Sequence, residues 1–280
     1  MRLAPVAVLL CACTFTFDPV EDIPHREFAT TGDAVRAILA EAGRPRVYAV
    51  GEYHATRAAI VRQSPLAHFT GEIIALLEPH AQHLVVEAWL DGTCRGNEAD
   101  PIGAQVTAAT GRPPTTQGDL QHLISTSQHL RMQTHGLPVT CIEHSSVLDP
   151  RGRVDFYRLL VLVTEKLGSS ARQLVGAGRE VIVYGGALHN DLFPRWPLEE
   201  LSYAQSLAAE LGGGVLELDL VVPEIVAPMA LVRLEPWFPL LGRASPDRVI
   251  VWQRGPDSYV VILPAETEAV AKVAKPRAVM

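Results

Sequence analysis

The sequence Arg46-Val-Tyr-Ala-Val-Gly-Glu-Tyr-His54 begins as an apolar run and ends in glycine, glutamate, tyrosine and histidine. The sequence Glu180-Val-Ile-Val-Tyr-Gly-Gly-Ala-Leu-His189 is a second apolar run followed by glycine and histidine. Short apolar runs rich in β-branched and aromatic residues and bounded by glycine are typical of buried strands. Each stretch therefore predicts a strand that delivers a histidine just beyond its C-terminal end.

Further apolar runs alternate along the chain with segments of helical periodicity. In the segment from Thr31 to Ala42, for example, Val35, Ile38 and Leu39 recur at helical spacing behind an N-cap. The other predicted helices cover 64–77, 118–135, 154–177 and 198–211, and the other predicted strands cover 84–89, 138–142 and 215–221. Residues 249–252 and 259–263 flank a turn and predict a β-hairpin.

Near-continuous apolar strands separated by helices indicate a parallel sheet covered on both faces. We therefore expect an α/β fold with a doubly wound parallel sheet and a C-terminal β-hairpin, in one domain over residues 29–265. Counting the five main strands in chain order from residue 46, the common doubly wound order 3-2-1-4-5 is the expected central arrangement.

The composition excludes several classes of protein. The 280 residues carry 24 basic and 31 acidic side chains, a formal charge of −7, and 48% of them are hydrophobic. This composition is typical of a globular chain rather than a disordered one. The acidic balance argues against nucleic acid as a partner, and the sequence has no apolar run of the ~18–20 residues that a membrane span needs.

The N-terminus has the pattern of a secretory signal, with Arg2 followed by an apolar stretch up to Ala12. Its end, Leu10-Cys-Ala-Cys13, resembles a bacterial lipobox. That resemblance implies a signal peptide over 1–12, acylation of Cys13, a tether up to residue 28, and a lipid-anchored protein of the bacterial cell envelope. Residues 266–280 are expected to form a flexible tail.

Two cysteines, Cys94 and Cys141, remain in the body of the chain. In an oxidising compartment they form either a disulfide bond or two buried, inert thiols. The sequence leaves both alternatives open.

Ionisable residues gather where the predicted strands end. They are Glu52, His54, Glu87, Glu143, His144, His189 and Asp191. Ligands of open parallel sheets bind at the carboxyl ends of the strands. With the expected strand order, His54, Glu87 and His189 converge from three adjacent strands, and Glu143 and His144 lie one strand further out.

Each of these residues also has a structural alternative. A single histidine at a strand end is often only capped or solvated. Glu87 lies within an apolar strand, and a buried carboxylate there needs a partner. An arginine such as Arg57 or Arg62 would satisfy it as an ion pair.

The paired motifs Gly51-x-x-His54 and Gly186-x-x-His189, with Glu87 between them, resemble the superfamily of Tiki metalloproteases, TraB/PrgY proteins, erythromycin esterases and ChaN-like haem-binding lipoproteins. The run Gly51-Glu-Tyr-His54 is most similar to the ChaN-like branch. The resemblance covers residues 46–220. Erythromycin esterases place a glutamate three residues before the histidine, whereas Glu52 here precedes His54 by two.

The resemblance and the residue types favour a metal-dependent hydrolase of the peptidase or esterase type. His54, His189 and Glu52 or Glu87 would hold Mn, Zn or Co and leave a position for water, and the remaining glutamate would act as general base. Asp191 or Glu143 would orient a ligand histidine, with His144 and Arg57 close by. The substrate would be a small molecule or a peptide.

The alternative from the same branch is a haem- or iron-binding uptake lipoprotein without catalysis. Tyrosine and histidine can be axial haem ligands, and Tyr53 lies within the first motif. Trp89, Phe193 and Trp196 flank the predicted site, although they are equally expected in the core. A protein that retains the fold without either activity is a third possibility.

Overall fold

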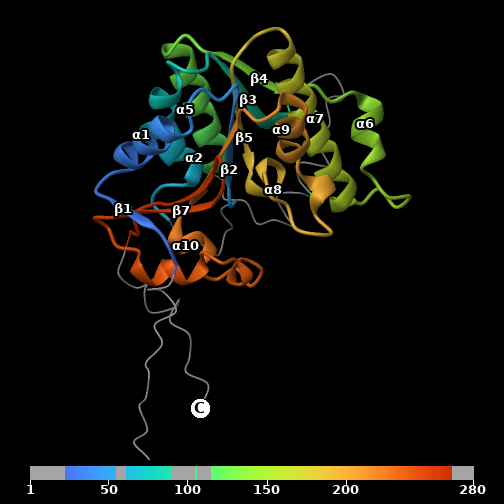
Figure 1. Ribbon diagram of the computed structural model, residues 1–280. Coiled ribbons are helices and arrows are strands. Elements are labelled where there is room, and N and C mark those ends of the chain that lie inside the picture. Colours follow the sequence, from blue (N-terminus) through green and yellow to red (C-terminus); the bar gives the residue numbers. More distant parts are fainter. Residues whose placement is uncertain (1–22, 55–60, 90–104, 106–114, 267–280) are drawn as a thin grey trace, which may run out of the picture.

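The computed structural model describes residues 23–54, 61–89, 105 and 115–266. They form one eight-stranded sheet with the order β1-β7-β8-β6-β2-β5-β3-β4 (Figure 1). The strands are β1 Arg26–Phe28, β2 Val47–Glu52, β3 His83–Trp89, β4 Gln133–Leu137, β5 Val181–Gly186, β6 Val215–Val221, β7 Val249–Gly255 and β8 Ser258–Ile262. The predicted signal peptide, Cys13, most of the tether and the tail beyond Glu266 lie outside the described residues. The prediction of an unstructured tether up to residue 28 is wrong at its end, because Arg26–Phe28 pair with β7 as strand β1.

The sheet is mixed rather than purely parallel. Neighbouring strands from β4 through β3, β5, β2 and β6 to β8 are parallel, whereas β7 runs antiparallel to both β8 and β1. The predicted hairpin is confirmed as β7–β8. Its turn contains Asp257 at a positive φ of 56°, a conformation that aspartate tolerates better than most residues.

The predicted neighbours β2 and β5 are confirmed, with Gly51 opposite Gly185 in register. The predicted position of β2 between β3 and β5 is wrong, because β5 lies between β2 and β3. The central strands are similar apolar runs, so their pattern does not distinguish one inner position from another.

The predicted strand 138–142 is also wrong. The strand is β4, five residues earlier, and Cys141–Ser146 form the helix α6. The Thr140 side chain accepts a hydrogen bond from the backbone N–H of Glu143, and the Glu143 carboxylate accepts one from the backbone N–H of Thr140. This capping box starts a helix where the apolar residues alone indicate a strand. Cys141 is disulfide-bonded, and the other three cysteines lie outside the described residues.

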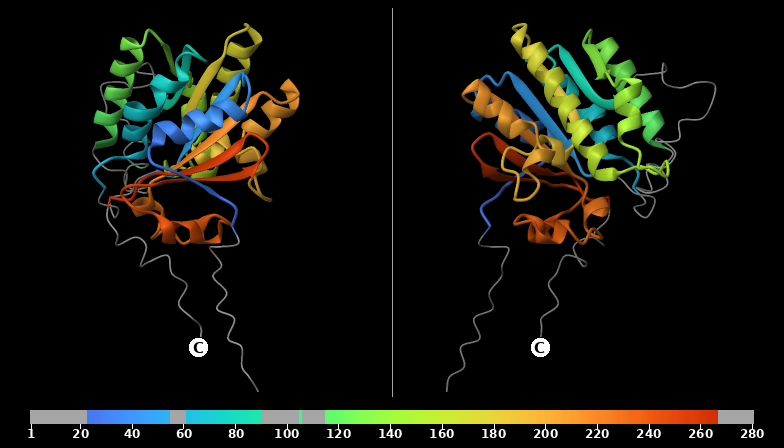
Figure 2. Two further views of the ribbon diagram at one scale, coloured as in Figure 1. Left: turned by 60° about the vertical axis from the view of Figure 1, so that its left-hand side comes forward. Right: turned by 90° about the vertical axis from the view of Figure 1, so that its right-hand side faces the viewer.

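Helices cover both faces of the sheet (Figure 2). One face packs against α1 (Thr31–Glu41), α2 (Pro65–His68), the π-helical turn η1 (Phe69–Ile73), α3 (Ile74–Leu77) and α5 (Thr115–His129). The opposite face packs against α7 (Phe156–Gly176) and α9 (Ala204–Leu211). The predicted covering of the sheet on both faces is therefore confirmed.

Short helical segments complete the fold. They are α8 Ala187–Asn190, η2 Glu199–Leu201, α10 Pro223–Val226, η3 Val232–Leu234 and η4 Phe238–Arg243. Within the part of the chain that the structure describes, no helix has the length and apolarity needed to cross a bilayer.

Gly51 permits a close approach between β2, β6 and the start of α8. A Cβ atom on Gly51 would lie 2.2 Å from Oδ1 of Asp219 and 2.8 Å from the Cα of Ala187. The Ala187 contact is with backbone, which cannot move aside as a flexible side chain would. We expect Gly51→Ala to lower the free energy of unfolding by about 1–3 kcal/mol, the usual cost of overpacking a core, as measured by urea denaturation.

Gly118→Ala is the matched control, because a Cβ there meets nothing within 4 Å and the residue lies within α5. It should stabilise the helix by up to about 1 kcal/mol. Equal effects of the two substitutions would contradict the role given to Gly51.

Candidate functional site

His54 lies two residues after the end of β2 and is held by the carboxylate of Glu52, the last residue of that strand. Its Nδ1 is 2.6 Å from Oε1 of Glu52, and its Nε2 is 3.8 Å from Oε1 of Glu87 on β3. The first distance is a strong hydrogen bond and the second is too long for one. With the proton on Nδ1 directed to Glu52, Nε2 keeps its lone pair on the side of Glu87.

A second hydrogen bond, from Tyr184, holds the Glu52 carboxylate in place. The Tyr184 hydroxyl on β5 donates a hydrogen bond to Oε2 of Glu52, so both carboxylate oxygens are engaged. Burial, and then the neighbouring Glu52, raise the pKa of Tyr184 well above its usual range, which keeps the phenol protonated as a donor. The Tyr184 ring packs on Phe69 in the π-helical turn, with centroids 4.6 Å apart. Helix η1, Tyr184 and Glu52 thus fix the ring of His54.

His189 is buried in α8, only 2% exposed, and its Nδ1 is 2.7 Å from the Thr164 hydroxyl. Two backbone carbonyls, of Leu160 and Leu201, also lie within hydrogen-bond distance of that hydroxyl. Because a hydroxyl has one proton to donate, this arrangement favours donation from Nδ1–H of His189 to Thr164. Thr164 is therefore the residue that orients His189, and sequence reasoning did not single it out.

His54, Glu87 and His189 meet around Gly186, as predicted. A Cβ on Gly186 would lie 3.1 Å from Nε2 of His54, 3.4 Å from Cδ2 of His189 and 3.5 Å from Oε2 of Glu87. The backbone N–H of Gly186 donates to the same Glu87 oxygen at 2.7 Å. A side chain at this position would occupy the space where the three groups converge.

The described residues do not form a ready metal centre. Within the described ranges, no group of three or more His, Cys, Asp or Glu side chains is arranged to hold a metal ion. Glu52, predicted as a ligand, has its two oxygens on His54 and Tyr184. The donor atoms nearest Gly186 are Nε2 of His54 and Oε2 of Glu87. Metal binding therefore stays a prediction.

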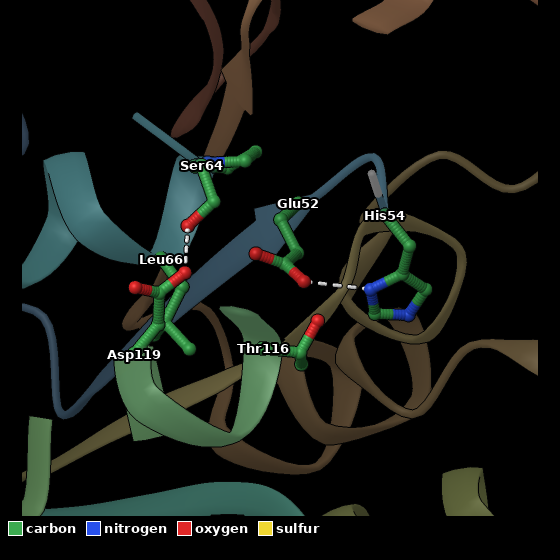
Figure 3. A pocket seen from close by; sticks show the side chains of 7 residues that line it. Glu52, His54, Ser64, Leu66, Thr116 and Asp119 are labelled. Carbon is green, nitrogen blue, oxygen red and sulfur yellow. Dashed lines mark hydrogen bonds and ion pairs between the residues drawn. The ribbon is translucent and has the colours of Figure 1, made fainter. Parts of the chain in front are cut away.

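An open cleft of about 300 Å³, a volume that includes its solvent-open mouth, lies beside the Glu52–His54 pair (Figure 3). Ser64, the N-cap of α2, donates a hydrogen bond of 2.7 Å to Asp119 on α5. In Figure 3 the Thr116 hydroxyl points toward Glu52 and His54. The lining residues are Glu52, His54, Ser64, Pro65, Leu66, Thr116 and Asp119.

Other predicted site residues have different surroundings. Glu143 caps α6 and pairs with Lys166 at 2.6 Å, and hydrogen bonding to Lys166 and Thr140 lowers its pKa to about 2. His144 follows it in α6 rather than ending a strand. Asp191 accepts hydrogen bonds from Arg254 and from the backbone of Phe193, so it stabilises the loop after His189. Arg57 lies outside the described residues.

Behind the site is a buried charge cluster that sequence reasoning missed. Arg254 on β7 lies 2.6 Å from Asp191, 3.6 Å from Glu217 and 3.7 Å from Asp219. Glu217 and Asp219 are each 1% exposed on β6. The signal in the sequence is the run Leu-Glu-Leu-Asp-Leu at 216–220, which alternates within a strand that is buried throughout.

This cluster retains a proton near neutral pH. Burial, together with the nearby Asp191 and against the opposing effect of Arg254, raises the pKa of Glu217 to about 7. Burial and then the Glu217 charge raise the pKa of Asp219 well above its usual range. If all were ionised, three carboxylates beside one guanidinium would leave the cluster with a net charge of −2.

Comparison with known proteins gives no family for this chain. No protein-family description matches it, and no curated protein matches it. Among solved structures, it is similar to that of the type III effector HopBA1, with a TM-score of 0.45 and 14% sequence identity, over 90% of this chain and 100% of that chain. Function must therefore be argued from the site itself.

The Glu217 carboxyl predicts a pH dependence of stability. Its pKa is higher in the folded protein, about 7, than the ordinary value of 4.5. Between these values the folded state binds more protons than the unfolded chain, so the free energy of unfolding falls as pH rises from about 4.5 to 7. One such group contributes a slope of at most about 1.4 kcal/mol per pH unit.

Glu217→Gln should flatten this slope in chemical denaturation series, because the amide cannot ionise yet retains an oxygen for the backbone N–H of Leu192. Glu180→Gln, at an exposed position before β5, is the control and should leave the slope intact. An unchanged slope in Glu217→Gln would contradict the assignment of this titration to Glu217.

Proposed function

We propose that this protein is a hydrolase of ester or amide bonds, anchored by lipid in the bacterial cell envelope, in which His54 is the general base. The observation that carries the proposal is the 2.6 Å hydrogen bond between Glu52 and Nδ1 of His54 beside an open cleft. A carboxylate behind a histidine fixes the tautomer and orients the ring, which is the arrangement that general-base histidines use.

The chemistry follows from the groups around His54. Nε2 of His54 takes a proton from a water molecule whose oxygen attacks the substrate carbonyl carbon. The imidazolium that forms lies between two carboxylates, Glu52 on Nδ1 and Glu87 at 3.8 Å from Nε2, and both stabilise its charge. The proton then passes from Nε2 to the leaving oxygen or nitrogen as the carbonyl–heteroatom bond breaks.

His189 and Gly186 have supporting roles in this proposal. Gly186 supplies the room for His54 and the N–H that holds Glu87. His189, oriented by Thr164, fills the space beside them. If a divalent ion binds, His54 and Glu87 are the described donors closest to Gly186, and the ion would lower the pKa of a bound water.

Location in the envelope is supported by the lipobox-like Leu10-Cys-Ala-Cys13 and the apolar signal before it. The disulfide at Cys141 also agrees with an oxidising compartment. The paired glycine–histidine motifs support membership in the ChaN-like and Tiki superfamily, which remains a proposal. No described feature favours haem binding over hydrolysis, and a Soret band in the purified protein would distinguish them.

The first test is His54→Ala, assayed with an activated ester such as p-nitrophenyl acetate and with an unstructured peptide mixture. Loss of the general base should reduce hydrolysis about 10²–10⁴-fold. His129→Ala, at an exposed position in α5, should retain full activity. Elemental analysis of both proteins, with and without chelator, shows whether a metal ion binds at His54. Hydrolysis that persists in folded His54→Ala protein would refute the proposal.

The second test is Tyr184→Phe, which removes the hydroxyl on Glu52 but keeps the ring against Phe69. We expect kcat to fall about 3–30-fold with little change in KM, because Tyr184 orients Glu52 and does not line the cleft. The pH dependence of kcat should also shift, since Glu52 then interacts differently with His54. Tyr157→Phe removes an exposed hydroxyl that donates to Glu200 and is the matched control. If Tyr184→Phe leaves kcat and the pH profile unchanged, Tyr184 does not orient Glu52 for catalysis.

A further inference from the structure

Residues 223–243, from α10 through η3 to η4, form a separate layer beyond the carboxyl edge of the sheet; we call it the distal layer (Figures 1 and 2). Its inner side is anchored in the core. Val232 is 6% exposed, and Trp237, Leu240 and Leu241 are fully buried. Its attachment to the sheet is therefore firm.

The outer side of the distal layer is apolar and exposed. Leu231 is 82% exposed and Leu234 is 73% exposed. Residues three apart in a 3-10 turn lie one above the other, as Leu231 and Leu234 do here. Val232, between them in sequence, points into the core instead. Pro228, Ala230 and Pro236 are also exposed. Exposed leucines grouped in this way mark an interaction surface more often than scattered ones do.

The charge of the distal layer differs from that of the whole chain. Its ionisable residues are Glu224, Arg233, Glu235 and Arg243, a net charge of zero, whereas the whole chain carries −7. Glu235 is also paired with Arg195 at 3.0 Å. A neutral, apolar face of an acidic protein can approach an anionic lipid surface with the least repulsion.

The position of the chain start indicates what this face meets. The described chain begins beside the distal layer in every view (Figures 1 and 2), and Ile23 packs against the core cluster that contains Val232 and Trp237. Cys13 is ten residues earlier. Ten extended residues span at most about 35 Å, so an acyl chain on Cys13 holds this side of the protein close to a bilayer.

We infer that the distal layer docks on the lipid bilayer, with Leu231 and Leu234 inserted at the interface. The argument rests on the anchoring of Cys13 in the proposed function. It also bears on the candidate site, because Tyr53, next to His54, packs edge-on against Trp237 of the distal layer with centroids 5.8 Å apart. The carboxyl edge of the sheet therefore faces the membrane side of the protein.

The test uses the chain from residue 13 onward with Cys13→Ser, which keeps the whole described fold and carries no acyl chain. It is mixed with vesicles of phosphatidylethanolamine containing a minority of phosphatidylglycerol, and the bound fraction is measured by co-sedimentation. In the same background, Leu231→Asp with Leu234→Asp should lower the partition coefficient at least about tenfold. Ile142→Asp, at an 83% exposed position on α6, should leave it unchanged.

Three outcomes would overturn the inference. They are no binding by the parent chain, equal binding by the double variant, or an equal loss in Ile142→Asp. A change of molar mass in the double variant without a change in vesicle binding would assign the surface to a second copy of the chain instead. Far-UV circular dichroism confirms that each variant is folded. Since the assay needs neither acylation nor hydrolysis, its result is independent of the His54 tests.

Discussion

The structure depends on the close approach of backbones at the carboxyl ends of β2 and β5. Gly51 faces Gly185 and Glu52 faces Gly186 across this strand pair. Gly51 leaves room for Asp219, and Gly185 leaves room for Glu87. Gly186 leaves room for His54 and His189. None of the three has the positive φ that only glycine adopts easily, so the constraint is one of space. Side chains at these positions would force apart the polar groups that define the site.

The polar groups near this strand pair differ in how well their hydrogen bonds and charges are paired. His54 and His189 each have Nδ1 fixed by a neighbour, Glu52 and Thr164, respectively. The Arg254 cluster, by contrast, has one cation for three carboxylates. Burying charges costs several kcal/mol each unless they are paired, and the raised pKa values of Glu217 and Asp219 show how the protein avoids that cost. The cluster ties β6, β7 and the loop after His189 together.

Much of the fold was predictable from the sequence, and so were the residues that meet in the site, but not the residues that orient them. The β2–β5 pair, the hairpin, the covering of both faces and the meeting of His54, Glu87 and His189 all follow from apolar runs and glycines at strand ends. The partners Thr164, Tyr184 and Arg254 were not predictable, because each is far in sequence from the residue it contacts. Glu143 was predicted at a strand end because the preceding residues Val139, Cys141 and Ile142 are apolar. The capping box that Thr140 and Glu143 form instead starts the helix α6.

The sequence by itself determined most of the strands, but neither β1 nor the position of β4, and it determined which polar residues follow β2, β3 and β5, because hydrophobic periodicity and glycine act locally. Only the tertiary structure decided the order of the strands, the pairing of β7 with β1, and the hydrogen bond by which Tyr184 fixes Glu52. These outcomes depend on long-range packing: β5 rather than β2 takes the position beside β3, and Tyr184 then reaches Glu52 across the β2–β5 pair. Local patterns carry no information about such contacts.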